Sequence, residues 1–411
     1  QVARVVAVYP DGMEDTLFLK GVRLAVGEVN AAGGVNGVPV LLEEVAEVPY
    51  TDHLSLEPVV ARTLRLAADI VRRPDLLAVI GHTSSATAVP ASSVYARANV
   101  LFLATHATAV SLTNHGFDTV FGLQVSDADT ATVMAHYATQ NGLRRLVVLA
   151  DGSGYGSDVG GLFRSAAALR GAEILHRGLL SSHNRSIDRL LLFLLDNTVF
   201  KPGDIDAFFV ASASHADTAN FITRARQLGL TQPILGPESL FSDRIARLAG
   251  PAMKDVAAAS LYDVEDRSDE ATSFAERFVT NTGGEPDLLA AVGYDAVKLL
   301  AFAAAQARSR DPKVLADALR VIRHEAPFIG ATGPMVFDAN GLVTDTGVFV
   351  VRHDGRAFRT VARYRKPLDL PPGAPALKDT ALDDAAPKEN RPKETPVPPM
   401  PAPATSLEVK P

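Results

Sequence analysis

The segment LLAVIGHTSSATAVPASSVYARANVLFLATHATAVSLT, residues 76–113, contains the pattern that decides the fold. Residues 76–80 form a short uninterrupted apolar run, which is typical of a strand buried on both faces of a parallel sheet. Residues 86–98 then place apolar side chains at helical spacing, and residues 100–104 form a second buried run. The segment therefore predicts a strand, a helix and a strand in immediate succession.

Loops rich in hydroxyl groups follow both of these strands. Ser84 and Ser85 precede the helix, at the position where a side-chain oxygen caps a helix N-terminus. His106, Ala107 and Thr108 follow the second strand. Because the carboxyl ends of adjacent parallel strands meet at one edge of a sheet, we expect the two loops to lie side by side, where open α/β sheets bind ligands. A helix N-terminus at that edge favours an anion such as a carboxylate.

The same alternation of strands and helices occurs along most of the chain. Residues 2–9 and 38–48 have the pattern of strands, and residues 16–31 and 57–73 have the pattern of amphipathic helices. The alternation resumes at residue 127 and continues to Glu238. This order predicts an α/β fold with doubly wound parallel sheets.

Length and composition limit the class of protein. With 411 residues and 47% hydrophobic content, the chain is long enough for two lobes, each with its own core. A net charge of -7 without a basic stripe argues against a nucleic-acid partner. No uninterrupted apolar run reaches the roughly 18–20 residues of a membrane span, so we expect a soluble protein. The chain starts directly on strand-like sequence, which fits a cytosolic protein or one whose signal has been removed, and the absence of Cys leaves the compartment undecided.

An enzyme of the dinucleotide-binding type is the main alternative from another class. The segment DGSGYGSD, residues 151–158, follows a predicted strand, but Ser157 stands where the third glycine of G-x-G-x-x-G belongs. The chain also lacks the G-x-S-x-G elbow and a convincing acid/base pair. His82 and His106 lie near the proposed site, but a metal needs more ligands at defined spacing. We therefore expect neither catalysis, nor a cofactor, nor a metal.

Three segments together resemble a known family. They are GVRLAVGEVNAAGGVNGVPVLL (residues 21–42), VIGHTSSATAVPAS (residues 79–92) and LFLATHATAVSLT (residues 101–113). In this order and at nearly this spacing, they resemble the substrate-binding proteins of branched-chain amino-acid ABC transporters, which are type I periplasmic binding proteins similar to the leucine/isoleucine/valine-binding protein. The resemblance covers residues 2–364.

The resemblance implies two Rossmann-like lobes joined by three hinge crossovers. Residues 1–122 and 251–329 are expected to form lobe I, and residues 123–250 and 330–366 are expected to form lobe II. Residues 330–358 alternate apolar and polar side chains around an Asn-Gly turn, which predicts an antiparallel hairpin. Residues 367–411 are rich in proline with few apolar residues, which predicts a disordered tail.

The resemblance also assigns roles to particular residues. It implies that the hydroxyls of Ser85 and Thr108 hold the α-carboxylate of an amino acid, while Ser84, Ala107 and His106 help mainly through the backbone. Three further assignments complete the expected site. Glu238 accepts the ammonium group of the ligand, Tyr155 closes over the ligand from the second lobe, and Phe18 lines the side-chain pocket.

The expected function is non-catalytic capture of a small amino-acid-like ligand between two closing lobes. The resemblance implies delivery to the membrane permease of an ABC transporter, with the protein in the periplasm or at the cell surface. The chain has small and polar residues at 212–215, where leucine-type binders supply an aromatic side chain. A sensor or regulator that binds an amide or an aromatic acid therefore stays open as an alternative.

Overall fold

The computed structural model describes residues 2–48, 56–181, 186–263, 265, 268–344 and 346–365. These residues lie within one compact unit, Gln1–Asp369. The predicted proline-rich tail, residues 367–411, lies outside the described residues.

The first lobe is built on a five-stranded parallel sheet with the order β2-β1-β3-β4-β5. Its strands are β1 (Ala3–Pro10), β2 (Val40–Glu47), β3 (Leu76–Gly81), β4 (Leu101–Ala104) and β5 (Val120–Gly122). The connecting helices are α1 (Leu17–Ala31), α2 (Leu56–Ile70), α3 (Ser85–Arg97) and the 3-10 helix η1 (Val110–Leu112). The predicted succession β3–α3–β4 is confirmed, and β3 pairs in parallel with β4.

The second lobe is built on a seven-stranded sheet with the order β15-β14-β10-β9-β8-β6-β7. Its strands are β6 (Arg145–Ala150), β7 (Glu173–Leu179), β8 (Ala207–Ala211), β9 (Ile234–Gly236), β10 (Val256–Ser260), β14 (Gly347–His353) and β15 (Phe358–Arg365). The helices are α4 (Asp127–Gln140), α5 (Gly154–Ala168), α6 (Ser186–Leu195), α7 (His215–Gln227) and α8 (Asp243–Ala249), with 3-10 helices η3 (Pro202–Asp204), η4 (Glu238–Leu240) and η5 (Gly250–Met253). The strands from β6 to β10 pair in parallel, and β14 and β15 add an antiparallel edge.

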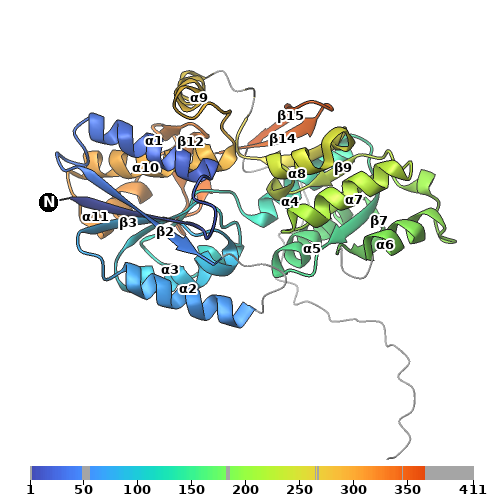
Figure 1. Cartoon of the computed structure of the whole chain (residues 1–411), viewed down its shortest axis with the longest axis horizontal. Coiled ribbons are helices and arrows are strands. Elements are labelled where there is room, and N and C mark those ends of the chain that lie inside the picture. Colours follow the sequence, from blue (N-terminus) through green and yellow to red (C-terminus); the bar gives the residue numbers. More distant parts are fainter. Residues whose placement is uncertain are drawn as a thin grey trace, which may run out of the picture. The chain divides into compact units, whose positions relative to one another are not determined.

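A later part of the chain completes the first lobe. It forms α9 (Asp269–Thr282), α10 (Leu288–Ala307), α11 (Pro312–Arg320) and a small antiparallel sheet of β11 (Phe328–Gly330), β12 (Gly333–Phe337) and β13 (Val343–Thr344). Helix α10 lies directly against α1, although the two are far apart in sequence (Figure 1). A Cβ atom at Gly21 would lie only 2.1 Å from the carbonyl oxygen of Ala290, so glycine permits this close contact.

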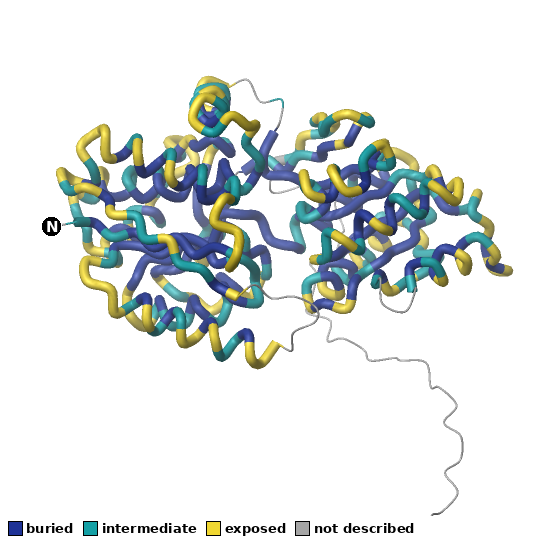
Figure 2. The backbone as a smooth tube through the Cα atoms, in the orientation of Figure 1, coloured by how far each residue is buried: buried dark blue, intermediate teal, exposed yellow. Residues whose placement is uncertain are grey.

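Helix α10 forms much of the core of the first lobe. By length and composition it could cross a membrane, but 72% of its most apolar window is buried within the lobe. It therefore has the burial expected of a central core helix. Figure 2 shows the same trend elsewhere, since buried residues concentrate in the two parallel sheets and exposed residues lie on the outer faces of the helices.

Two predicted lobe boundaries are wrong. Strand β10 was expected in lobe I, but it pairs with β9 and β14 in the sheet of the second lobe. Residues 330–344 were expected in lobe II. Instead the predicted hairpin forms between β12 and β13, and a bridge from Leu342 to Gly122 holds it at the edge of the first sheet. The chain therefore passes between the lobes after β5, after β10 and after β13, which confirms three crossovers but moves two of them.

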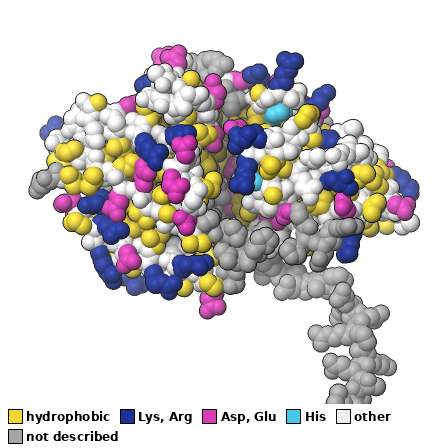
Figure 3. Space-filling view, viewed as in Figure 1, with side chains coloured by type: hydrophobic (Ala, Val, Ile, Leu, Met, Phe, Trp, Pro, Cys, Tyr) yellow, Lys and Arg dark blue, Asp and Glu magenta, His cyan; other side chains and the backbone are white. Residues whose placement is uncertain are grey.

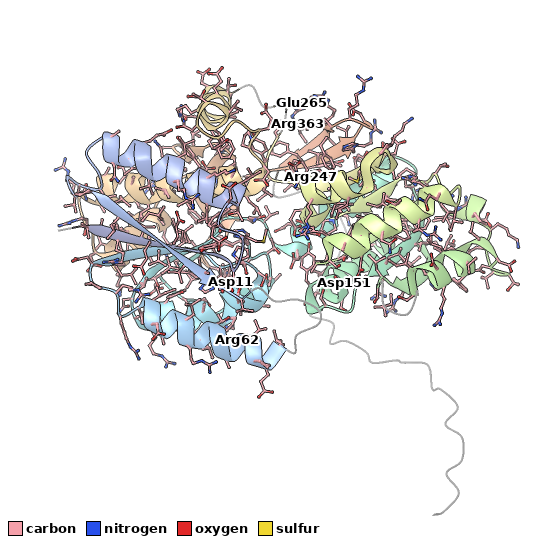
Figure 4. All side chains as sticks on the ribbon, viewed as in Figure 1. Asp11, Arg62, Asp151, Arg247, Glu265 and Arg363 are labelled. Atoms are coloured by element: carbon pink, nitrogen blue, oxygen red, sulfur yellow. The ribbon has the colours of Figure 1, made fainter. Side chains whose placement is uncertain are left out.

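Charged side chains cover the surface unevenly. In the view of Figure 3, Lys and Arg side chains gather along the lower edge of the first lobe, over α2, while acidic and basic side chains are mixed elsewhere. Arg62, labelled in Figure 4, lies on α2. This basic edge is formed by a helix that supplies none of the predicted site residues.

Candidate functional site

The two hydroxyl-rich loops of the first lobe lie side by side, as predicted. Gly81 at the end of β3 is opposite Ala104 at the end of β4. The Ser85 Oγ atom accepts hydrogen bonds from the backbone N–H groups of Thr108, at 3.2 Å, and Ala109, at 3.1 Å. The hydroxyl of one loop is thus joined directly to the backbone donors of the other.

Ser84 starts helix α3 with extended backbone angles, φ -163° and ψ 167°. Its side chain makes no capping hydrogen bond, but its carbonyl accepts the first helical bond, from Ala88 N at 2.8 Å. The expected N-cap position is therefore correct, whereas the hydroxyl is not used to cap the helix. It lies 3.4 Å from the hydroxyl of Thr87 instead.

A buried network that sequence reasoning missed supports this loop. Glu47, at the end of β2, contacts His82 Nδ1 at 2.6 Å and accepts hydrogen bonds from both the N–H and the hydroxyl of Thr83, each at 2.7 Å. His82 Nε2 lies 2.8 Å from the hydroxyl of Tyr95, and both residues are fully buried. Burial alone would raise the pKa of Glu47, but His82 and the bonds from Thr83 lower it. The network holds an ionised carboxylate beneath the loop and fixes the loop's position.

The first lobe also places Phe18 and His106 in contact. The two rings meet edge to face with their centroids 4.8 Å apart. Phe18 is only 2% exposed and packs against Gly293 of α10. The structure therefore places Phe18 in the core under His106, not at the surface of a ligand pocket. Burial lowers the pKa of His106 to about 4, so its ring is neutral at physiological pH.

In the second lobe, Tyr155 and Glu238 lie together although they are distant in sequence. The Tyr155 hydroxyl donates to Glu238 Oε1 at 2.7 Å and contacts Ser239 Oγ at 3.2 Å. Glu238 begins η4 directly after β9, and Tyr155 lies in the first turn of α5. Burial, followed by the charge of Glu238, raises the pKa of the Tyr155 phenol well above its usual range. The hydroxyl is therefore a stable donor.

Asp151 fixes the start of the helix that carries Tyr155. It lies just after β6 (Figure 4), and its carboxylate accepts hydrogen bonds from Ser153 N at 3.1 Å, Ser212 Oγ at 3.0 Å and Ala213 N at 2.6 Å. A Cβ atom at Gly156 would lie 2.1 Å from the Asp151 carboxylate. Of the glycines in GSGYG, Gly156 is therefore the one that the tight packing of the helix start requires, since a Cβ atom at Gly154 would meet nothing within 4 Å.

Asp127 is a second carboxylate of the site that sequence reasoning missed. It is the first residue of α4, and its backbone N–H donates to the Thr108 carbonyl at 2.9 Å. The residue is 5% exposed, and its Oδ1 atom has no hydrogen-bond partner among the described residues. Burial and the nearby Glu238 raise the pKa of Asp127 to about 7. In the sequence it was hidden by the capping motif of Ser126 and Asp129, which made it look like an ordinary helix start.

Glu238 has the same kind of unpaired atom. Its Oε2 is buried and has no hydrogen-bond partner among the described residues, and burial raises the pKa of this carboxyl. Neither Glu238 nor Asp127 forms an ion pair with a described Lys or Arg. An unpaired buried carboxylate costs free energy unless a cation or a proton compensates it.

A small cavity lies where both lobes and the crossovers meet. Its volume is about 10 Å³, which is room for roughly one water molecule. Its lining consists of Thr108, Gln124, Val125, Thr130, Glu238, Ala259, Ser260, Leu261 and Val348. Among the predicted site residues, Thr108 and Glu238 therefore reach the same cavity from opposite lobes. The described residues contain no group of His, Asp and Glu that could hold a metal ion.

These features define a two-lobed binding protein, with polar groups of both lobes converging where the crossovers pass. A sequence profile of the family described as "Periplasmic binding protein" matches residues 10–357. The chain belongs to this family.

Relatives and solved structures agree with this assignment. The Leu/Ile/Val-binding protein homolog 1 of Brucella abortus is 25% identical over 334 residues, which cover 81% of this chain and 84% of the relative. The leucine-, isoleucine-, valine-, threonine- and alanine-binding protein of Pseudomonas aeruginosa is 24% identical over 322 residues, covering 78% and 80%. The structure is also similar to an ABC transporter substrate-binding protein from Desulfitobacterium hafniense in complex with Leu, with a TM-score of 0.74, 27% identity and coverage of 88% and 100%.

Proposed function

We propose that the protein captures a small zwitterionic amino acid between its two lobes and delivers it to the permease of an ABC transporter. One observation carries the proposal: Thr108, a hydroxyl residue of the first lobe, and Glu238, a carboxylate residue of the second lobe, line the same cavity. Such a division matches the two charged ends of an amino acid. The similarity to proteins named for leucine, isoleucine and valine supports the same ligand class.

The carboxylate of the ligand binds to the first lobe. Helix α3 has 13 residues, and its N-terminus presents backbone N–H groups together with the Ser85 hydroxyl. Thr108 adds a hydroxyl from the neighbouring loop. Because Ser85 Oγ already bridges to the N–H groups of Thr108 and Ala109, a ligand carboxylate has to compete for these donors. Ser84, His106 and Ala107 shape the loops around this position.

The ammonium group of the ligand binds to the second lobe. Among the described residues, Glu238 Oε2 and Asp127 Oδ1 are the two buried carboxylate oxygens without a hydrogen-bond partner, and a cation placed between them supplies the missing charge. Tyr155 holds Glu238 in position through its 2.7 Å hydrogen bond. The two ends of the ligand are thus recognised by opposite lobes, and binding favours the closed arrangement by hinge motion at the three crossovers.

The setting of this function follows from the family. A periplasmic binding protein meets its ligand outside the inner membrane and passes it to a permease, so we place this chain in the periplasm or at the cell surface. A direct test is capture of the chain by membranes that contain its transporter in the presence of ligand.

Isothermal titration calorimetry with a defined panel tests the ligand class. L-leucine, L-isoleucine and L-valine are compared with 4-methylpentanoate, which lacks the amine, and with benzoate. Saturable binding of an amino acid with much weaker binding of 4-methylpentanoate supports the proposal. Binding of benzoate without amino-acid binding contradicts the proposal and favours the aromatic-acid alternative. The fold is also shared by a solute-binding protein from R. palustris in complex with benzoate, with a TM-score of 0.73 and 16% identity.

A further inference from the structure

The second lobe concentrates acidic groups around Tyr155. Asp127 comes from the start of α4, Glu238 from η4, and the exposed Asp158 from the second turn of α5. Glu238 and Asp158 both act to raise the pKa of Asp127, whereas the Thr108 hydroxyl acts to lower it. Tyr155, which donates a hydrogen bond to Glu238, and Ser239, which accepts one from Tyr155, are neutral hydroxyl groups. Asp127 therefore lies near enough to Glu238 and Asp158 for both charges to raise its pKa, and neither Asp127 nor Glu238 pairs with a described Lys or Arg.

This arrangement disfavours two negative charges at once. Asp127 Oδ1 and Glu238 Oε2 are both buried and without a hydrogen-bond partner among the described residues. Two carboxylates that share a desolvated site cannot both ionise without a large repulsion, so one of them retains a proton. A ligand ammonium changes this balance, because it supplies a positive charge at the place where the proton was held.

We propose that Asp127 and Glu238 hold one proton between them in the unliganded protein, and that the ammonium group of the ligand displaces this proton to solvent. The inference rests on the proposed function and adds a proton to its binding equilibrium. The charges balance: a proton and an ammonium group each neutralise one of the two carboxylates, so the site has the same net charge before and after the exchange. The ligand keeps its own ammonium protons throughout.

The exchange makes affinity depend on pH. The affinity should rise by up to tenfold per pH unit below about pH 7, where the pair is protonated, and level off above it, because each bound ligand releases one proton. An amino acid itself does not change charge between about pH 5 and 8. His106 does not interfere, since its pKa of about 4 lies below this range.

Calorimetry of L-leucine binding at about pH 6, in two buffers of different ionisation enthalpy, counts the protons released. We expect nearly one proton per leucine for the wild type and clearly fewer for Asp127→Asn, in which no second carboxylate repels the charge of Glu238. Asp158→Asn tests the assignment: it should retain proton release while shifting its midpoint to lower pH. Leucine binding with equal heats in both buffers and a flat affinity between about pH 5.5 and 8 overturns the inference but leaves the proposed function intact.

The melting temperature of the unliganded protein tests the shared proton even when leucine, isoleucine and valine do not bind. An acid whose pKa is raised on folding stabilises the protein at low pH and loses this contribution as the pH rises through the folded value. The melting temperature of the wild type should therefore fall relative to that of Asp127→Asn between about pH 5 and 8. Parallel melting curves of the two proteins across this range contradict the shared proton.

Discussion

Glu47 in the first lobe and Glu238 in the second lobe are two buried carboxylates with opposite surroundings. Both oxygens of Glu47 are used, by His82, Thr83 and Thr87. Glu238 receives one hydrogen bond from Tyr155 on Oε1, while Oε2 has no partner among the described residues. The pKa of Glu47 is lowered by its partners in spite of burial, and the pKa of Glu238 is raised by burial.

The difference shows that hydrogen-bond supply, and not burial alone, decides what a buried carboxylate does. Where donors surround it, the charge is stable and the residue supports the fold. Where a donor is missing, the residue weakens the fold and gains from a cation that arrives from outside. On this basis we assign Glu47 to loop support and Glu238 to ligand binding.

Substitution of Glu47 should have the largest effect. Glu47→Gln removes the charge that His82 and the Thr83 and Thr87 hydroxyls face, and we expect a loss of about 3 kcal/mol in the free energy of unfolding. Urea denaturation measures it. Glu57→Gln, at an exposed position in α2, is the control and should change stability by less than about 0.5 kcal/mol. Equal effects of the two substitutions would show that the network does not stabilise the loop.

Glu238→Gln should act on binding and not on folding. It removes the charge but keeps the shape, so we expect L-leucine binding to weaken by about 2 kcal/mol while the free energy of unfolding is unchanged or slightly higher. Calorimetry and urea denaturation measure the two quantities. Any residual binding of 4-methylpentanoate, which has no ammonium group, should be unaffected. Wild-type affinity for the amino acid in this variant would contradict the zwitterion arrangement.

His106 adds a third ionisable group to the comparison, a base that is partly exposed. Its pKa is lowered to about 4 by burial, so its contribution to stability is present above the unfolded pKa of 6.5 and is lost as the pH falls through about 4. Allowing for partial exposure of the ring, we expect a loss of about 1–2 kcal/mol between pH 7 and pH 4 that is absent in His106→Gln. Urea denaturation at both pH values, with the exposed His115→Gln as control, measures it.

Thr108→Val should have the smallest effect, because it removes a single neutral hydroxyl. We expect a loss of about 1 kcal/mol in binding of both L-leucine and 4-methylpentanoate, since both carry the carboxylate that this hydroxyl holds. Thr113→Val is a matched control in the same loop, buried but outside the cavity lining. A loss confined to L-leucine would place Thr108 at the ammonium end of the ligand instead.

Some of this site could be predicted from the sequence because local patterns carry it. The buried apolar runs of β3 and β4, with hydroxyl-rich loops after each, are sufficient to place Ser85 beside Thr108. The resemblance assigned Tyr155 and Glu238 to one ligand site without implying a contact between them, and the 2.7 Å hydrogen bond that joins them was not predicted.

Other parts depended on contacts that no local pattern reveals. Glu47 ends an ordinary edge strand and meets Thr83 only through the register of β2, β1 and β3. Asp127 was concealed by a capping motif that explains the same residues without a ligand. Phe18 occupies an apolar helix position that suits a pocket or a core equally well. Strand β10, VAAAS, is short and apolar except for Ser260, so its sequence contains nothing that selects one sheet over the other.

The contact of Gly21 with Ala290 has a consequence for the order in which the lobes form during synthesis. The two residues are roughly 270 positions apart, so the ribosome needs on the order of 10–50 s between them. During that interval α1 has no α10 to cover its apolar face, while the parallel strands of the second lobe, β6 to β10, have already emerged as one continuous stretch. The first lobe therefore stays incomplete while most of the second lobe is made, although the second lobe also waits for β14 and β15. Nascent chains arrested before residue 288 should expose α1 to chaperones and proteases.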